Sequence, residues 1–245
     1  MNRKWLGICV AAAMGTAAPS FGQSGVRKLV EIATTEHVPF QAGGTLHLNG
    51  SFGDLSVEGW DRPEVEITLT KTLDNLYDPS RQADAAKLAE RVHVTAERRS
   101  DTDLEINTTV PHYSRWTHPF GSNGGVMLTW RIRAPRQTKL EIRHRDGGVF
   151  VQGIVSDIEA AGRAGDIVLI LPEPETEHYT IDAKTRIGGV YSDFAGERRR
   201  TMTGLKYALA GSAPVRRVQL RMGVGGITIK GSPAAAQPPA TPSVQ

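Results

Sequence analysis

Short stretches of alternating apolar and polar residues recur along the chain, and five of them surround a glycine pair. A Gly-Gly or Gly-Asp pair begins at each of Gly53, Gly147, Gly165, Gly188 and Gly225. Apolar residues stand seven and five positions before each first glycine, and another stands two positions after it. Each copy therefore predicts a period-two strand, a glycine-bearing bend and a second period-two strand.

The shared register around the glycine pairs indicates an internal repeat. One unit has too little apolar surface to fold alone, but stacked units bring their apolar positions into continuous columns. The first glycines at 147, 165 and 188 are 18 and 23 residues apart, which suits the rungs of a solenoid. We therefore predict an all-β fold, a β-solenoid or β-helix-like stack of strand-turn-strand repeats. An antiparallel sandwich of hairpins is the alternative with the same strand pattern.

Two segments depart from the repeat. In the long insertion after the first copy, Asp78 and Pro79 can open a helix, and apolar residues from Ala85 onward mark one helical face. One inserted α-helix is therefore predicted near residues 79–91. Further strands are predicted at residues 92–97, 104–109 and 126–134, and an excursion is predicted around residues 197–214.

Four regions are predicted along the chain. Residues 1–22 have the pattern of a cleaved signal peptide, with Arg3 and Lys4 before an apolar run and small residues leading to Gly22. The alternative is an uncleaved anchor, but this run is shorter than the ~20 residues that span a bilayer. Residues 23–135 are predicted as an N-terminal β region with the first repeat and the helix-containing insertion. Residues 136–230 should hold the β-solenoid repeats, and the Pro- and Ala-rich residues 231–245 should be disordered.

Composition narrows the function classes. The only cysteine, Cys9, lies in the predicted signal peptide, so the mature chain would lack disulfides and cysteine metal ligands. Cleavage would also lower the formal net charge from +3 to +1, because Arg3 and Lys4 are removed without any acidic residue. Export and near-neutral charge disfavour nucleic-acid binding. No transmembrane anchor is predicted in the mature chain.

The block at residues 53–67, with Gly59-Trp60-Asp61 and the strand-like residues after it, carries a resemblance to a known family. Together with residues 131–135, the predicted helix and the later repeats, it resembles the bacterial putative-adhesin family of unknown function. The resemblance covers most of residues 36–230. It implies an extracytoplasmic β-solenoid-like fold and brings no catalytic residues.

Catalytic motifs are absent from the sequence. It contains neither a Gly-x-Ser-x-Gly nucleophile elbow nor a phosphate loop nor a dinucleotide-binding glycine turn. His112 and His118 could bind a metal only if a distant carboxylate joined them, and isolated surface histidines are the favoured interpretation. We predict no enzyme activity, no cofactor and no metal site. The alternative is an enzyme that acts on envelope glycans from a β-helical scaffold.

Aligned repeats place charged residues in columns. Two positions before the glycine stand Arg145, Arg163 and Arg186, which could bind the phosphate or carboxylate groups of an anionic polymer or lipid headgroup. The alternative is that these arginines pair with neighbouring aspartates. An acidic column and a basic column of mutually compensating charges are predicted beside them, formed by Glu141, Glu159 and Asp182 and by Arg143, Lys184 and Arg221.

An aromatic loop is the second candidate binding feature. Tyr113, Trp116 and Phe120 lie within nine residues that also contain Arg115. Exposed aromatic rings beside an arginine suit sugar stacking or contact with a partner. Alternatively, the loop caps an open end of the stack and so prevents edge pairing.

These patterns together predict an exported protein, periplasmic or extracellular, that serves as a non-enzymatic binding or scaffold module of the cell envelope. Its partner would be an envelope protein, a glycan or an anionic surface polymer. Self-association through stacked ends is a further alternative.

Overall fold

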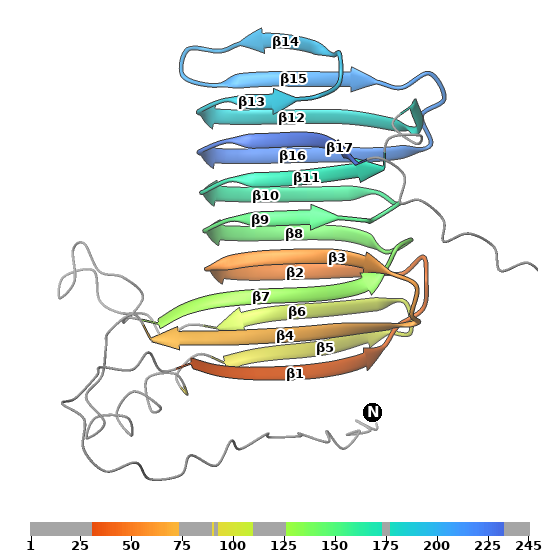
Figure 1. The fold of residues 1–245 in the computed structure, drawn as a ribbon, viewed down its shortest axis with the longest axis vertical. Helices are drawn as coiled ribbons and strands as arrows, with labels where there is room; N and C mark the ends of the chain where they lie inside the picture. Colours follow the sequence, from red (N-terminus) through yellow and green to blue (C-terminus); the bar gives the residue numbers. More distant parts are fainter. Residues whose placement is uncertain (1–30, 74–89, 91–92, 110–125, 173–176, 233–245) are drawn as a thin grey trace, which may run out of the picture.

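The protein is all-β in the computed structural model, which describes residues 31–73, 90, 93–109, 126–172 and 177–232. Seventeen strands form two mixed sheets (Figure 1). The eight-stranded sheet has the order β1 (Glu31–Pro39), β4 (Glu64–Leu73), β7 (Val126–Pro135), β3 (Asp54–Trp60), β9 (Val149–Gln152), β11 (Ile167–Pro172), β17 (Ile227–Ser232) and β13 (Val190–Ser192). The nine-stranded sheet has the order β14 (Glu197–Arg200), β15 (Leu205–Ala210), β12 (Tyr179–Ile187), β16 (Arg216–Val224), β10 (Ile158–Ala164), β8 (Lys139–Asp146), β2 (Thr45–Phe52), β6 (Asp103–Thr109) and β5 (His93–Ser100).

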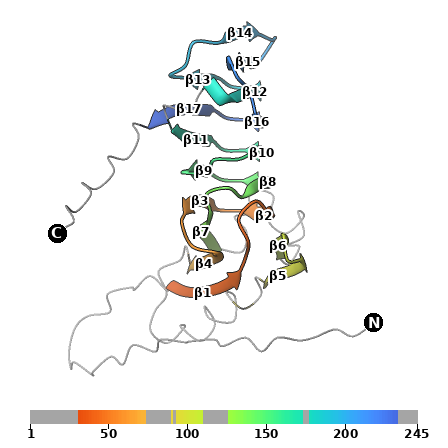
Figure 2. The ribbon, with the colours of Figure 1, turned by 90° about the vertical axis from the view of Figure 1, so that its right-hand side faces the viewer.

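The hydrophobic core lies between the two sheets, which stand as two layers in Figure 2. All three apolar positions of every repeat are buried there, as the sequence predicts. The position seven residues before the glycine forms one continuous column across five parallel strands: Leu46, Leu140, Ile158, Val218 and Ile181. The apolar alternation of each strand therefore fixes which face points inward.

Each repeat contributes one strand to each sheet, and neighbouring repeats pair in parallel and in register. Their order in space differs from their order in the chain. The fifth repeat, β16 and β17, lies between the third, β10 and β11, and the fourth, β12 and β13. The stack is thus not a solenoid that winds through its repeats in sequence order. Strand β15 pairs antiparallel with one edge of β12, and the fifth repeat occupies the other edge.

The strands predicted after the insertion are confirmed as β5, β6 and β7. The excursion around residues 197–214 is confirmed as the antiparallel pair β14 and β15. The predicted helix near residues 79–91 lies outside the described residues except for residue 90, and the described residues form no helical element. Nor do they include a helix that is long and apolar enough to cross a membrane.

The described residues include only some of the boundaries predicted between regions of the chain. The predicted signal peptide, residues 1–22, lies outside the described residues. Gly231 and Ser232, the first residues of the predicted disordered tail, pair with the last two residues of β11, and the rest of that tail lies outside the described residues. Strands from residues 23–135 and 136–230 pair with each other in both sheets, as β2 does with β8 and β3 with β9. The boundary at residue 135 stays a prediction.

The first glycines of the five repeats form a close-packed column at the bends. Each has a positive φ, between 96° and 131°. A Cβ atom on Gly165 would lie 2.0 Å from the carbonyl oxygen of Gly147, and Gly147, Gly225 and Gly188 have equivalent contacts with their own neighbours. Glycine is required here both by the backbone conformation and by the close stacking of the bends.

Candidate functional site

A row of basic side chains crosses the outer face of the nine-stranded sheet. In-register pairing places Arg143 of β8, Ala161 of β10, Arg221 of β16 and Lys184 of β12 side by side. The row continues because Lys184 pairs with Lys206 of β15, which pairs with Arg199 of β14. We call the five basic members of these six positions the basic row: Arg143, Arg221, Lys184, Lys206 and Arg199. At the usual strand spacing of about 4.8 Å, the row is about 24 Å long.

The three arginines predicted as a ladder occupy the neighbouring row, two residues closer to the bends. Arg145 and Arg163 are on adjacent strands. The register places Gly223 of β16 between Arg163 and Arg186, because the fifth repeat lies between the third and the fourth. The structure therefore brings Arg163 and Arg186 to opposite sides of a position without a side chain.

A surface hollow of about 390 Å³ opens at this position. We call it the basic hollow, and its lining residues are Gly162, Arg163, Lys184, Arg186, Arg221, Met222 and Gly223. A Cβ atom on Gly223 would lie 2.4 Å from the carbonyl oxygen of Arg163, so the backbones of β10 and β16 approach closely here. The absence of a side chain on Gly223 leaves space among four cationic side chains.

Two of these four cations are paired. The Nη2 atom of Arg163 donates to both carboxylate oxygens of Asp146, at 3.0 and 3.1 Å. Arg221 pairs with Asp182, with 3.0 Å between Nη2 and Oδ2. Within the described residues, Lys184 and Arg186 have no ion-pair partner. Surface ion pairs contribute little to stability, about 0–1 kcal/mol, so an anionic ligand could compete with the two carboxylates.

The predicted acidic column is interrupted next to the basic hollow. Gln219 of β16 lies between Glu159 and Asp182. Further along the sheet, Glu141 is close to Lys139 and His47, at 3.4 and 3.0 Å. The predicted pairing between the two columns therefore holds for Asp182 and Arg221, whereas Glu141 pairs with residues outside the basic column. The Lys184–Arg186 side of the hollow stays positively charged.

Sequence reasoning missed part of this face. Lys206 and Arg199 belong to the excursion, which has no repeat register to align, so only strand pairing reveals them. The sequence shows that the fifth repeat has Gly223 at the position where the second, third and fourth repeats have arginine. It does not show which arginines lie beside Gly223, because that depends on the order of the repeats in space. The aromatic residues Tyr113, Trp116 and Phe120 lie outside the described residues, and their binding role stays a prediction.

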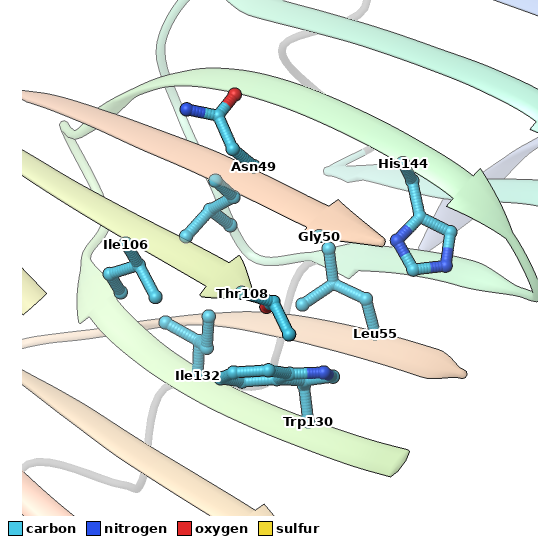
Figure 3. A pocket seen from close by; sticks show the side chains of 9 residues that line it. Asn49, Gly50, Leu55, Ile106, Thr108, Trp130, Ile132 and His144 are labelled. Carbon is cyan, nitrogen blue, oxygen red and sulfur yellow. The ribbon is translucent and has the colours of Figure 1, made fainter. Parts of the chain in front are cut away.

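A small interior cavity lies between the sheets, beside Trp130 and His144 (Figure 3). Its volume of about 10 Å³ accommodates about one water molecule, which is too little for a larger ligand. The Nε2 atom of His144 lies 2.8 Å from the carbonyl oxygen of Gly53, which assigns the proton to Nε2. Burial lowers the pKa of His144, and the hydrogen bond to Gly53 raises it by less. His144 is thus a neutral core residue.

The described residues contain no group of three or more histidine, cysteine, aspartate or glutamate side chains that could hold a metal ion. The basic row and the basic hollow offer arginine and lysine side chains. Such groups form charge-assisted hydrogen bonds to phosphate and carboxylate oxygens.

No family model and no curated protein matches the chain. Solved bacterial structures do align with it. A "putative cell adhesion protein" from Clostridium sporogenes is 15% identical, with a TM-score of 0.48, and the alignment covers 84% of this chain and all of that one. A "putative adhesin" from Bacteroides fragilis is 11% identical, with a TM-score of 0.26 and coverage of 85% and 100%. Another from Parabacteroides distasonis is 11% identical, with a TM-score of 0.23 and coverage of 85% and 98%.

All three are bacterial proteins with adhesin or cell-adhesion titles. The family that the sequence resembles has the same label. At these identities and TM-scores the titles transfer no ligand to this chain. The function proposed below therefore rests on the chain's own residues.

Proposed function

We propose that this protein is a non-enzymatic binding module of the cell envelope, and that the basic row and the basic hollow bind an extended anionic polymer. The observation that carries the proposal is the alignment of five basic side chains in one register row beside a hollow with two unpaired cations. Export to the periplasm or the cell surface is part of the proposal, and it is supported by the signal-peptide pattern of residues 1–22.

A rigid row of cations suits a polymer better than a small anion. Strand pairing holds the four positions from Arg221 to Arg199 about 4.8 Å apart, and Arg143 follows two strands from Arg221. Successive negative groups on an extended chain can therefore each meet a cation. Arginine binds phosphate and carboxylate oxygens in a planar, bidentate way, which adds geometric selectivity to the charge attraction. Binding of this kind weakens with salt, because the cations are exposed and screened.

The carboxyl groups around the basic hollow support a role in binding rather than in catalysis. Hydrolysis of a glycan usually requires two carboxyl groups on either side of the scissile bond, one of them protonated. The two carboxylates next to the hollow, Asp146 and Asp182, are each paired with an arginine. Both carboxylates are thus engaged in ion pairs on the sheet surface rather than free to act on a glycosidic bond.

The test uses residues 23–245 and two soluble probes, polygalacturonate for carboxylates and inorganic polyphosphate for phosphates. We expect at least one probe to bind, with an affinity that falls steeply with salt. The double variant Lys184→Gln/Arg186→Gln should weaken binding by about tenfold or more, because it removes the two unpaired cations. Isothermal titration calorimetry at two salt concentrations measures both effects.

The matched control is Arg62→Gln/Arg136→Gln. It removes the same charge from two exposed arginines near Asp61 and Glu64, away from the basic row. An equal loss in both double variants would mean that net charge alone attracts the probes and would overturn the proposed site. Failure of both probes to bind the unmodified chain would overturn it as well.

A further inference from the structure

The eight-stranded sheet forms the layer opposite the nine-stranded sheet that carries the basic row (Figure 2). Its outer face carries a second hollow. Its volume is about 190 Å³. Its lining comes from β7, β3, β9 and β11 and from the bend residues just before β9 and β11. Four of the lining residues are Asp54, Ser56, Phe150 and Asp166.

The order of the repeats creates this hollow. In space, Gly-Asp and Gly-Gly pairs alternate over the first four positions of the stack, as Gly53-Asp54, Gly147-Gly148, Gly165-Asp166 and Gly225-Gly226. Gly148 therefore lies between Asp54 and Asp166 in the row of bends. The space left by its missing side chain is bordered by the Asp54 carboxylate, since a Cβ atom on Gly148 would lie 3.2 Å from Asp54 Oδ1. The two aspartates are two strands apart, which corresponds to about 9.6 Å between their backbones.

Backbone hydrogen bonds fix both carboxylates. The Oδ1 atom of Asp54 accepts from the amide of Gly148 at 3.0 Å, and Oδ1 of Asp166 accepts from the amide of Gly226 at 2.7 Å. Each Oδ2 atom has no hydrogen-bond donor among the described residues. The hollow thus presents two carboxylate groups with a free acceptor oxygen each. Their positions are fixed, because each carboxylate is hydrogen-bonded to a backbone amide of the neighbouring bend.

An aromatic ring lies beside these acceptors. Phe150 is half-buried on β9, between Ser56 of β3 and Val168 of β11 in the same register row. Arg131 of β7 extends that row next to Ser56 and adds a donor. An aromatic surface with acceptors, a hydroxyl group and a guanidinium donor around it matches a pyranose ring, which has an apolar face and hydroxyl groups at its edge.

We propose that this hollow binds a neutral pyranose unit of an envelope glycan. The sugar ring lies over Phe150, and its hydroxyl groups donate to the Oδ2 atoms of Asp54 and Asp166. A cationic ammonium group is the competing ligand, because it too is attracted to carboxylates and an aromatic ring. Arg131 disfavours the cation, because it lies next to Ser56 in this row and repels a second positive charge, whereas it can donate to a sugar hydroxyl.

Together with the basic row, this site would give the molecule two binding faces of different chemistry. One face would bind an anionic polymer and the other a neutral glycan. The glycan site does not depend on the proposed anion site, since it lies on the other sheet and uses different residues.

The experiment titrates residues 23–245 with maltohexaose, cellohexaose and chitohexaose at millimolar concentration and follows binding by saturation-transfer NMR and calorimetry. We expect at least one of these neutral oligosaccharides to bind, with an affinity that does not change with salt. Phe150→Ala should weaken that binding by about tenfold or more, because it removes the stacking surface. Tyr191→Ala is the matched control and should leave binding unchanged, since this exposed tyrosine is two strands further along than Val168 in the same row.

A second variant protects the test against misfolding. Asp54→Asn/Asp166→Asn retains an oxygen that accepts the backbone amides, so the bends stay formed while the carboxylates are lost. It should also weaken oligosaccharide binding, by about threefold or more. The inference is overturned if none of the three oligosaccharides binds, or if both variants bind as the unmodified chain does. The hollow would instead be a cation site if hexalysine binds in a salt-sensitive way, the double variant abolishes that binding, and no oligosaccharide binds.

Discussion

At the scale of single residues, His144 is a polar side chain placed in a nonpolar environment. It is 5% exposed, and its Nδ1 atom has no hydrogen-bond partner. Gly50, on the neighbouring strand, makes room for the ring, because a Cβ atom there would lie 2.8 Å from Nδ1. The ring links β8 of the second repeat to the bend of the first repeat through the carbonyl oxygen of Gly53. Its neutral form is therefore part of the folded state.

Stability should consequently fall at acidic pH. Burial lowers the pKa of His144 below its value in the unfolded chain, 6.5. The unfolded state therefore binds a proton at a pH where the folded state does not, so this contribution is complete above pH 6.5 and is lost as the pH falls through the folded pKa. One such group changes the free energy of unfolding by up to about 1.4 kcal/mol per pH unit.

Urea unfolding at several pH values between 7 and 4 measures this dependence. His144→Gln is the comparison, since its side-chain amide can donate to Gly53 but does not titrate. The difference in unfolding free energy between the two chains should shrink as the pH is lowered. A constant difference over this range would contradict the assignment of His144 as a buried neutral residue.

At the scale of elements, the bends are joined through their backbones. The amide of Gly147 donates to the carbonyl oxygen of Ala164, and that of Gly165 donates to the carbonyl oxygen of Val224. Aspartates at the second position of two bends accept from the next bend in the stack. The bends are thus a third ladder of hydrogen bonds between the two sheets.

Substitutions in this ladder should differ strongly with position. Gly165→Ala places a Cβ atom 2.0 Å from the carbonyl oxygen of Gly147 at a φ of 127°, so it should destabilise the fold by about 3 kcal/mol or more. Gly189→Ala is the control, because a Cβ atom there has no neighbour within 4 Å, and its effect should stay within about 0.5 kcal/mol. Urea unfolding measures both. Similar losses for the two variants would show that close stacking at the bend is not what requires glycine.

At the scale of the whole molecule, the fifth repeat joins the fourth to the rest of the stack. Strand β16 pairs with both β10 and β12, and β17 pairs with both β11 and β13. The fourth repeat and the β14–β15 pair therefore contact the other repeats mainly through the last strands of the chain.

Removal of residues 215–245 tests this order. We expect residues 179–210 to lose protection from amide hydrogen exchange, because β12 and β13 lose their only strand neighbours toward the described core. Residues 139–172 should stay protected, since β8 and β9 keep their pairing with β2 and β3, and β10 and β11 keep theirs with β8 and β9. Hydrogen exchange followed by mass spectrometry compares the shortened and full-length chains. Retained protection over residues 179–210 would indicate that the fourth repeat stacks directly on the third, as in a sequential solenoid.

The local structure of this protein follows from the amino-acid sequence alone. Period-two alternation and the glycine pairs predicted the strands, the bends and the inward positions, because these depend on neighbouring residues and on backbone conformation. Arg145, Arg163 and Arg186 were correctly placed on one outer row, since every repeat shares the same register.

Only the tertiary structure decided which repeats are neighbours. All five repeats have similar edges, so local pattern cannot select the partner of a strand, and the choice depends on where the β14–β15 pair covers β12. That order places Gly223 between Arg163 and Arg186, adds Lys206 and Arg199 to the basic row, and places Gly148 between Asp54 and Asp166. Both proposed binding faces therefore depend on two things: the register within each repeat, which is encoded locally, and the long-range pairing that makes particular repeats neighbours.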